Sequence, residues 1–295
     1  VALYVALPNT WTNCAVVTYS HWRLALVAFL VMLTPPKSTR EAVFDMAIVL
    51  LAGLGGPLML LLAPVALLHC YLKPDERSWR FTGLVLATAA IQTACLVVSG
   101  ATRSAAPLGA SVTAFFGIFS NQVVLGVLLG QSEYSRFVEA WPGVAAAPTV
   151  ILIGLAGIAV LGYAVARGPY ALRLFVGYAT IVFAATLFSA SVSGTSQWEA
   201  LTHPGAGTRY FLFAMLAFVA AMVWMAGQAR LPVRVVGVAL LAVMVAFGIL
   251  HDWKHPRLVD YDYPKYVEEY DNAPVGASVE IPINPPGWNM VLVKR

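Results

Sequence analysis

The chain has 295 residues, of which 60% are hydrophobic and only 11% charged, and its mean hydropathy is +0.77. Soluble globular domains carry roughly 45–50% apolar and about 25% charged residues, so the composition excludes a soluble enzyme, a nucleic-acid-binding protein and a disordered chain. The formal net charge is +4, and in so apolar a chain basic residues indicate topology at membrane edges rather than an anionic partner. The composition predicts a polytopic membrane protein.

The chain starts without a Met residue, in an apolar run over residues 1–7. No basic segment followed by a small-residue cleavage site, as in a signal peptide, is present there. From this start we expect the chain to be the C-terminal part of a longer protein.

Apolar segments long enough to cross about 30 Å of hydrocarbon recur along the chain. The first, about residues 20–34, stops at Pro35-Pro36. Residues 43–72 are too long for one straight helix, and Gly55-Gly56-Pro57 predicts a tight turn or a kink within them. Further spans are predicted for residues 81–100, 149–166, 174–192, 211–228 and 235–250.

Residues 111–131 are apolar but carry Ser120, Asn121 and Gln122 at their middle. This pattern fits a re-entrant or interfacial helix as well as a full span.

The basic residues predict the sidedness of these segments. The linkers 35–42, 73–80, 167–173 and 229–234 hold nine of the 18 Lys and Arg residues, and the positive-inside rule places such linkers in the cytoplasm. Residues 55–57 then form an external hairpin. Residues 101–148 begin and end outside, so the segment within them dips into the outer face or forms two short helices.

The last 45 residues, 251–295, differ in composition from the preceding 250 and form a predicted extracytoplasmic tail. A short helix is predicted at residues 264–271. Residues 277–283 alternate apolar and polar side chains, the period of a half-buried strand. A Pro-Pro-Gly turn and a second apolar run at 288–294 complete a predicted β-hairpin. The fold class is therefore an all-α membrane helix bundle over residues 1–250, with interfacial or re-entrant external helices and a small β-hairpin tail.

Arg209 is the most suggestive polar residue on the predicted outer face, because it ends a glycine-rich loop, residues 204–209, that runs directly into a helix. Backbone N–H groups at a helix start and an Arg fork bind phosphate or pyrophosphate. The alternative is an interfacial Arg that anchors the helix to lipid headgroups, with Tyr210 as an aromatic-belt residue.

Other outer-face residues are weaker candidates for the same site. Arg103 and Arg136 would add positive charge, or lie solvated in loops. Trp22 can stack on a sugar that His21 hydrogen-bonds, or both can be ordinary interfacial residues.

Metal chemistry is not predicted. His251 and His255 are spaced as an i, i+4 pair, but no third ligand has fixed spacing. Cys14, Cys70 and Cys95 lie in apolar surroundings without ligand spacing, which is typical of buried thiols. The sequence predicts no cofactor, and no carboxylate pair, nucleophile elbow or phosphate-binding loop appears.

Four short motifs together resemble the C-terminal half of large bacterial membrane glycosyltransferases of the GT-C type. They are residues 20–26, 53–57, 207–211 and 281–290. The resemblance implies a many-helix bundle in the bacterial plasma membrane that transfers a sugar from a polyprenyl-phosphate donor to an acceptor on the extracytoplasmic face. It implies that Arg209 contacts the donor phosphate and that Arg103 and His21 line the same cavity.

The acidic catalytic base of that superfamily usually lies in a first external loop near the N-terminus, which this chain would lack. Glu199, close to Arg209 in sequence, is the substitute candidate. The resemblance and the outer-face residues together assign substrate binding to Arg209, Tyr210, Arg103, His21, Trp22, Arg136 and His203.

The sequence leaves two other functions open. A transporter or flippase would use Gly55-Gly56-Pro57 and the polar residues 120–122 as breaks in discontinuous helices around a substrate. A non-catalytic membrane subunit would use the hairpin tail to bind another chain. The expected partners are membrane lipids and a polyprenyl-phosphate-linked sugar, and the sequence does not specify the sugar or the acceptor.

Overall fold

The computed structural model describes residues 4, 6–10, 19–99, 106–189, 196–203, 205–252, 258–284 and 288–295. The chain divides into two compact units, Val1–Trp253 and Lys254–Arg295. The sequence predicted a division after residue 250, and the last helix of the first unit, α14 (Leu250–Asp252), extends two residues beyond it.

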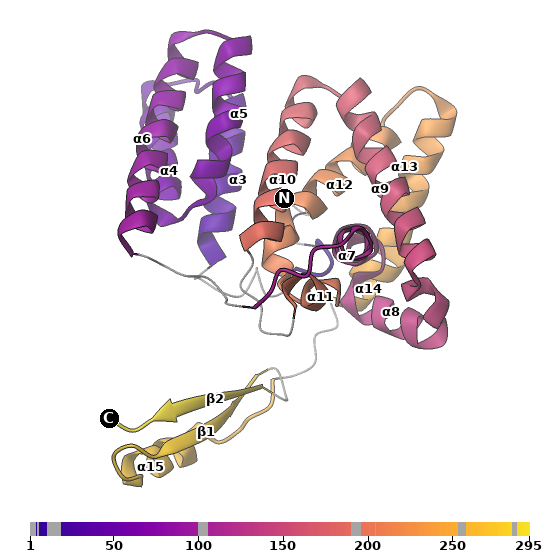
Figure 1. The fold of residues 1–295 in the computed structure, drawn as a ribbon. Coiled ribbons are helices and arrows are strands. Elements are labelled where there is room, and N and C mark those ends of the chain that lie inside the picture. The colour runs from indigo at the N-terminus through magenta and orange to yellow at the C-terminus, as the bar shows by residue number, and fades with distance from the viewer. Residues whose placement is uncertain are drawn as a thin grey trace. The chain divides into compact units, whose positions relative to one another are not determined.

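The first unit is built from helices (Figure 1). In chain order these are α3 (Ser20–Leu33), α4 (Thr39–Gly55), α5 (Leu58–Leu72), α6 (Glu76–Ser99), α7 (Val112–Ile118), the π-helix η2 (Phe119–Leu125), α8 (Gly126–Ala140), the 3₁₀ turn η3 (Pro142–Ala145), α9 (Ala147–Arg167), α10 (Tyr170–Ser189), α11 (Gln197–Thr202), the 3₁₀ turn η4 (Thr208–Phe211), α12 (Leu212–Ala226), α13 (Leu231–Val243), the π-helix η5 (Met244–Ile249) and α14.

Within the described residues, six helical segments are long and apolar enough to cross a membrane, and α3 and α5 are shorter apolar helices. The six are Glu76–Ser99, Val112–Ala140, Ala147–Arg167, Tyr170–Phe188, Thr208–Ala226 and Leu231–Asp252. Their number and hydropathy make the chain a multi-pass membrane protein, as its composition predicted.

The breaks between the first helices follow from local sequence. Pro35 and Pro36 come directly after α3, and Ser38 caps α4 by accepting a hydrogen bond from the Glu41 N–H at 3.3 Å. Gly56 and Pro57 separate α4 from α5, so the glycine-proline motif ends one helix and starts the next, running back alongside it (Figure 1). The predicted hairpin within residues 43–72 is therefore present.

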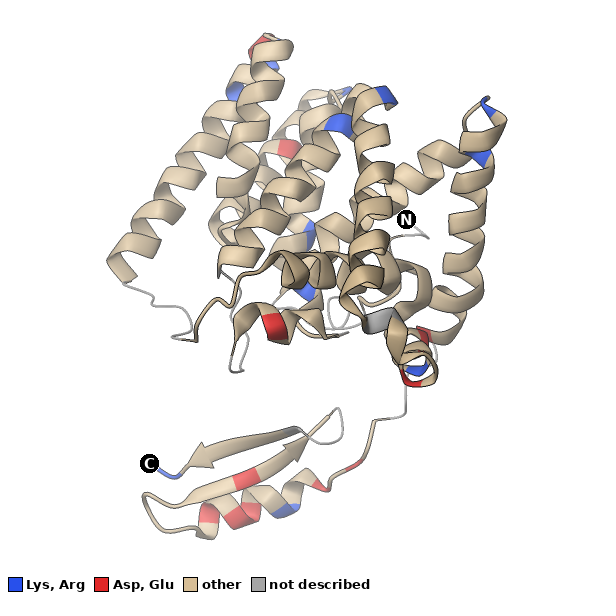
Figure 2. Cartoon of the chain, turned by 45° about the vertical axis from the view of Figure 1, so that its right-hand side comes forward, with Lys and Arg blue, Asp and Glu red and all other residues tan. Residues whose placement is uncertain are grey.

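The connections between helices gather at two opposite ends of the first unit (Figure 1). One end carries the connections at 34–38, 73–75, 168–169 and 227–230, and we call it the basic end. Most Lys and Arg residues of the first unit lie towards it (Figure 2). The other end, which we call the loop end, carries residues 56–57, 106–111 and 196–207.

The segment Val112–Ala140 differs from the other apolar helices in direction. Figure 1 shows α7 along its axis, whereas α9, α10 and α13 are seen from the side. Gly130 interrupts α8 with a φ of 71° and a ψ of 177°. The segment is thus a helix lying across the bundle that changes direction at Gly130, and whether it is interfacial, re-entrant or a full span stays a prediction.

The polar residues of η2 hold a loop that is remote in sequence. Ser120 donates to the Val150 carbonyl at 2.5 Å, and Asn121 donates to the Thr202 carbonyl at 2.9 Å. The Gln122 amide donates to the carbonyls of Leu201 and His203 at 2.8 and 2.5 Å. Buried carbonyls need such donors, so Asn121 and Gln122 fix α11 against η2, and Ser120 fixes η2 against the helix that contains Val150.

Asp252 closes the first unit across the break at Gly130. Its Oδ2 accepts hydrogen bonds from the backbone N–H groups of Asn9 at 2.8 Å and Gln131 at 3.0 Å, and its Oδ1 accepts one from Ser132 at 3.2 Å. A side chain at residue 130 would meet this carboxylate at 2.4 Å, and its φ of +71° also favours glycine. The carboxylate therefore caps the helix that restarts at Gln131 and holds the buried N-terminal segment.

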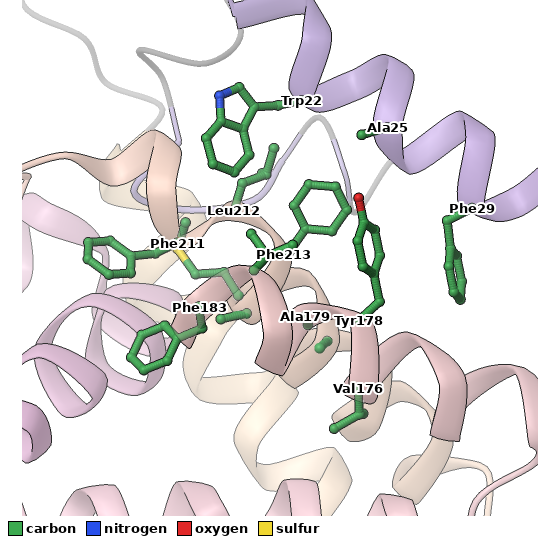
Figure 3. Packing of buried hydrophobic residues seen from close by; sticks show 14 of the residues in the cluster. Trp22, Ala25, Phe29, Val176, Tyr178, Ala179, Phe183, Phe211, Leu212 and Phe213 are labelled. Carbon is green, nitrogen blue, oxygen red and sulfur yellow. The ribbon is translucent and has the colours of Figure 1, made fainter. Parts of the chain in front are cut away.

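An aromatic cluster joins α3, α10 and α12 in the core (Figure 3). Phe29 stacks on Tyr178 with centroids 5.7 Å apart, and Tyr178 contacts Phe213 edge-on at 4.9 Å. Trp22 lies 6.1 Å from Phe213. Because Tyr178 also donates to the Leu58 carbonyl at 3.3 Å, the cluster fixes the start of α5 as well.

The second unit contains α15 (Tyr263–Asn272) and an antiparallel hairpin of β1 (Ser278–Ile283) and β2 (Trp288–Val293). These elements match the predicted tail to within one residue at each boundary. Val279 and Ile281 are 4% and 7% exposed, so the alternating residues of β1 bury one face as the period-2 pattern predicted.

Candidate functional site

A cavity of about 440 Å³ opens at the loop end of the first unit, and we call it the Arg209 cavity. Its walls come from the start of α3, the start of α5, the end of α10 and η4. The lining residues are Tyr19, His21, Trp22, Pro57, Leu58, Leu60, Leu61, Val182, Ala185, Thr186, Arg209 and Tyr210. Four predicted binding residues, His21, Trp22, Arg209 and Tyr210, are thus brought together from segments almost 190 residues apart.

Arg209 is held in this cavity by two phenol groups. Its Nη1 donates to the Tyr19 hydroxyl at 2.9 Å and its Nη2 to the Tyr210 hydroxyl at 3.0 Å. Its guanidinium carbon lies 5.1 and 4.5 Å from the centroids of the two rings, a cation–π arrangement. The two tyrosines therefore orient the guanidinium without neutralising its charge.

The loop before Arg209 turns at Gly207, which has a φ of 61°. A Cβ there would lie 2.9 Å from the Tyr210 ring and 3.2 Å from Leu201, so glycine satisfies both the left-handed backbone and the close approach of the ring. Thr208–Phe211 then starts the apolar helix, which places Arg209 in its first turn.

The electrostatic balance of the Arg209 cavity is positive. Within the part of the chain that the structure describes, ion pairs involve other basic residues, and no Asp or Glu lies against Arg209. No carboxylate appears among the described lining residues either. A guanidinium carries five N–H donors, of which the two phenols use two, so the fork can bind an anion.

His21 and Trp22 form one wall of the cavity. Their ring centroids are 5.7 Å apart, and Trp22 contacts the Tyr210 ring edge-on at 6.1 Å. Gly56 follows α4 directly beneath His21, and a methyl group at that position would lie 3.2 Å from the imidazole ring. The glycine of the sequence motif therefore makes room for the histidine.

The remaining walls are apolar. Leu58, Leu60 and Leu61 come from α5, and Val182 and Ala185 come from α10. A cavity with a guanidinium on one side and aliphatic side chains on another fits a ligand that has an anionic head and a hydrocarbon chain.

Glu199 and His203 lie elsewhere. They line a second cavity at the loop end, of about 540 Å³, which we call the Asn121 cavity. Its lining residues are Gly109, Ser111, Thr113, Ala114, Gly117, Asn121, Tyr134, Val138, Val150, Ser196, Glu199, Thr202 and His203. The sequence placed Glu199 beside Arg209 because ten residues separate them, whereas α11 docks on η2 and carries Glu199 into the other cavity.

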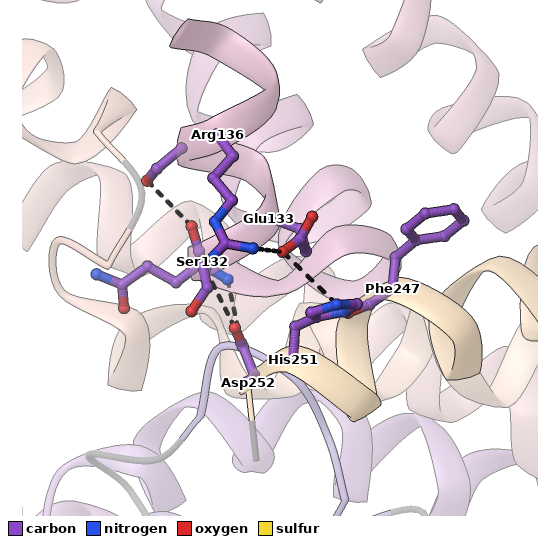
Figure 4. A network of polar contacts seen from close by, with 8 residues as sticks. Ser132, Glu133, Arg136, Phe247, His251 and Asp252 are labelled. Atoms are coloured by element: carbon purple, nitrogen blue, oxygen red, sulfur yellow. Dashed lines mark hydrogen bonds and ion pairs between the residues drawn. The ribbon is translucent and has the colours of Figure 1, made fainter. Parts of the chain in front are cut away.

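Arg136 belongs to neither cavity and forms a surface network (Figure 4). Its Nη1 lies 2.8 Å from the Glu133 carboxylate, and its side chain is 72% exposed. His251 Nε2 lies 3.8 Å from the same carboxylate. Arg136 is thus paired at the surface on α8.

Arg103 and His255 lie outside the described residues, as does Cys14. Asp252, beside His251, uses its carboxylate to bind three backbone N–H groups. Within the described ranges, no three His, Cys, Asp or Glu side chains come together as metal ligands would.

Sequence reasoning missed Tyr19 and the α5 wall. Tyr19 directly precedes the Ser-His-Trp-Arg motif. This position suggests that Tyr19 lies near His21 and Trp22, but it does not predict the hydrogen bond to Arg209. The wall of Leu58, Leu60 and Leu61 follows the Gly-Gly-Pro turn, and nothing local predicts that this turn brings α5 beside the start of α3.

Comparisons of the chain with protein-family models, with curated proteins and with solved structures give no significant match.

Proposed function

We propose that this protein is a membrane glycosyltransferase that binds a polyprenyl-phosphate-linked sugar in the Arg209 cavity and transfers the sugar to an acceptor. The observation that carries the proposal is the Arg209 guanidinium, which is oriented by two phenols and lacks a described carboxylate neighbour, in a cavity with an aliphatic wall. The motif resemblance to GT-C enzymes leads to the same donor class.

The donor fits the cavity through two kinds of contact. Phosphate oxygens accept charge-assisted hydrogen bonds from a guanidinium fork, which are about twice as strong as neutral ones. The first turn of the helix beginning at Thr208 adds backbone N–H groups and the positive end of the helix dipole. The isoprenoid chain extends along the leucine residues of α5. Trp22 and His21 supply a ring face and an imidazole for the sugar.

The proposed reaction is an inverting displacement. The oxygen of an acceptor hydroxyl bonds to the anomeric carbon, and the bond from that carbon to the phosphate oxygen breaks. The electron pair leaves with the polyprenyl phosphate, and the hydroxyl proton passes to a carboxylate. Arg209 stabilises the charge that develops on the leaving phosphate. Glu199 is the candidate base, since it is the carboxylate among the described residues of the Asn121 cavity, which is lined by the same segment 196–211 as the Arg209 cavity.

The proposed location is the bacterial plasma membrane, with the basic end in the cytoplasm and the loop end outside. In this orientation both cavities open on the extracytoplasmic side, where polyprenyl-linked donors are used. The C-terminal unit would lie outside as well.

Binding of undecaprenyl monophosphate to the protein in lipid nanodiscs tests the proposal. A hydrogen bond to a charged group contributes about 1.5–3 kcal/mol, so Arg209→Ala should weaken binding about 10- to 100-fold. The affinity of Arg209→Lys should lie between those of the unaltered protein and Arg209→Ala, because an ammonium group keeps the charge but cannot donate two parallel hydrogen bonds. Arg80→Ala is the matched control, since Arg80 is exposed and pairs with Glu76 at 2.6 Å.

In cells, Arg209→Ala should abolish glycan transfer while the amount of protein in the membrane stays normal. Full transfer activity in this variant, or equal losses of lipid binding in Arg209→Ala and Arg80→Ala, would reject the assignment.

Transport is the second candidate function, and the interruption of Val112–Ala140 at Gly130 favours it, because discontinuous helices often surround transported substrates. The other predicted break, at the polar residues 120–122, lies at least eight residues before Gly130, and its side chains are bonded to backbone carbonyls. A labelled polyprenyl-phosphate sugar in proteoliposomes distinguishes the two functions. Movement of intact label across the bilayer supports transport, and a glycosylated product supports transfer.

A further inference from the structure

The Asn121 cavity has a lining unlike that of the Arg209 cavity. Its polar groups are the hydroxyls of Ser111, Thr113, Ser196 and Thr202, the Asn121 amide, the Tyr134 phenol, the Glu199 carboxylate and the His203 imidazole. No Lys or Arg is among its described lining residues. A phosphate would find no cation among these described residues and would be repelled by Glu199.

Asn121 gives this cavity an unsatisfied acceptor. The residue is 8% exposed, and its Nδ2 donates to the Thr202 carbonyl at 2.9 Å. Its Oδ1 has no hydrogen-bond partner among the described residues. A buried carbonyl oxygen without a donor costs about 1–3 kcal/mol. Because this oxygen is itself covered, a ligand hydroxyl gains by donating to it once the Asn121 side chain turns toward the cavity.

The other lining groups fit the same ligand. Hydroxyls both donate and accept, a carboxylate accepts, and an imidazole does either, which suits the several hydroxyl groups of a sugar. Ala114, Val138 and Val150 provide apolar patches for its C–H faces. The volume of about 540 Å³ lies within the range of about 300–1,000 Å³ usual for small-molecule sites.

We propose that the Asn121 cavity binds an uncharged saccharide and that this saccharide is the acceptor of the transfer. The acceptor role rests on the proposed function, whereas the preference for a neutral sugar follows from the lining alone. The segment 196–211 supports a relation between the two cavities, because it supplies Glu199 and His203 to one and Arg209 and Tyr210 to the other.

The binding test uses saturation-transfer NMR on the full chain in nanodiscs without polyprenyl phosphate. The probes are the methyl glycosides of glucose, mannose and galactose, with glucose 6-phosphate as the charged comparator. We expect at least one methyl glycoside to bind and glucose 6-phosphate not to bind. Binding of none of the three glycosides, or preferential binding of glucose 6-phosphate, overturns the proposal.

Two variants locate the binding. Val138→Trp adds an indole to a half-buried lining position and should abolish the signal. Tyr134→Phe removes one hydroxyl from a side chain that is 3% exposed and should weaken binding at least about threefold, the loss of one hydrogen bond. Arg80→Ala, at the basic end, should bind as the unaltered protein does. Sugar binding that persists in Val138→Trp overturns the proposal.

Undecaprenyl monophosphate binding measured on the same samples separates the two proposals. If the methyl glycoside binds but the lipid phosphate does not, the donor assignment fails and the saccharide site stands. If only the lipid phosphate binds, the saccharide site fails.

Discussion

The Arg209 cavity and the Asn121 cavity are similar in volume, about 440 and 540 Å³, and share the segment 196–211. The first combines a guanidinium, two phenols and aliphatic walls. The second combines hydroxyls, an amide and a carboxylate, without a described Lys or Arg. The described positive charge therefore lies in one cavity, and the hydroxyl, amide and carboxylate groups that can hydrogen-bond a sugar lie in the other, at the same end of the bundle. Two ligands of different chemistry can bind there without competing for the same groups.

Of the four further changes considered, Glu199→Gln should produce the largest effect. Loss of a general base lowers transfer by about 10²- to 10⁴-fold, whereas undecaprenyl monophosphate binding should not change, because Glu199 lies in the other cavity. Radiolabelled sugar transfer and lipid binding are measured in parallel. Glu139→Gln makes the same change on an exposed position of α8 and should leave transfer intact. A loss of lipid binding in Glu199→Gln would contradict the separation of the cavities.

Gln122→Leu should destabilise the docking of α11 on η2. It removes the two hydrogen bonds that the amide donates to the carbonyls of Leu201 and His203, and the one that Gln122 Oε1 accepts from Asn9 Nδ2 at 3.4 Å. At about 1–3 kcal/mol for each of the two carbonyls left without this donor, the free energy of unfolding in detergent should fall by roughly 2–6 kcal/mol. Gln228→Leu, which removes a single bond to the Trp224 carbonyl at the basic end, is the control. Equal losses in the two variants would show that the α11 contact is not special.

Tyr19→Phe should act on the Arg209 cavity alone. The variant keeps the ring but removes the hydroxyl that accepts from Arg209 at 2.9 Å. If the loss of this hydrogen bond costs about 1 kcal/mol of binding free energy, undecaprenyl monophosphate should bind roughly fivefold more weakly. Tyr163→Phe, on α9 against Trp224, should bind normally. Tighter binding by Tyr19→Phe would mean that the phenol blocks the ligand.

Gly56→Ala should have the smallest effect. The new methyl group would lie 3.2 Å from the His21 ring, whereas the methyl group of Gly55→Ala would lie 4.0 Å from the His21 Cβ. Overpacking costs about 1–3 kcal/mol of folding free energy. Replacing glycine lowers the conformational entropy of the unfolded chain, which recovers about 0.4–1 kcal/mol. We expect Gly56→Ala to bind undecaprenyl monophosphate about twofold more weakly. Gly55→Ala should bind it as tightly as the unaltered protein does, measured by the same titration. Identical affinities would remove His21 from the binding wall.

Much of the fold follows from local signals in the sequence. Proline pairs and glycine-proline turns mark the ends of α3 and α4, and alternation of Val279 and Ile281 with polar residues marks β1. Such signals act over a few residues and need no tertiary information. They also indicated Arg209 and the His21-Trp22 pair, which the structure places in one cavity.

The position of Glu199 and the role of residues 120–122 could not be predicted in the same way. Asn121 and Gln122 bond to carbonyls 79 to 81 residues further along the chain. Their polarity suggested a substrate path, although their hydrogen bonds hold α11. Glu199 is close to Arg209 in sequence, which suggested a shared site. The two residues line different cavities because α11 docks on η2, and this docking depends on those remote bonds, which no local signal predicts.

The carboxylate of Asp252 has a consequence for the order of assembly during synthesis. It joins the N–H of Asn9 to the helix that restarts after Gly130, yet it is made 243 residues after Asn9. Contacts so distant along the chain form late and slowly. The earlier helices must therefore enter the membrane before the Asp252 carboxylate can cap the helix that restarts at Gln131. The last helix completes this arrangement when it is inserted.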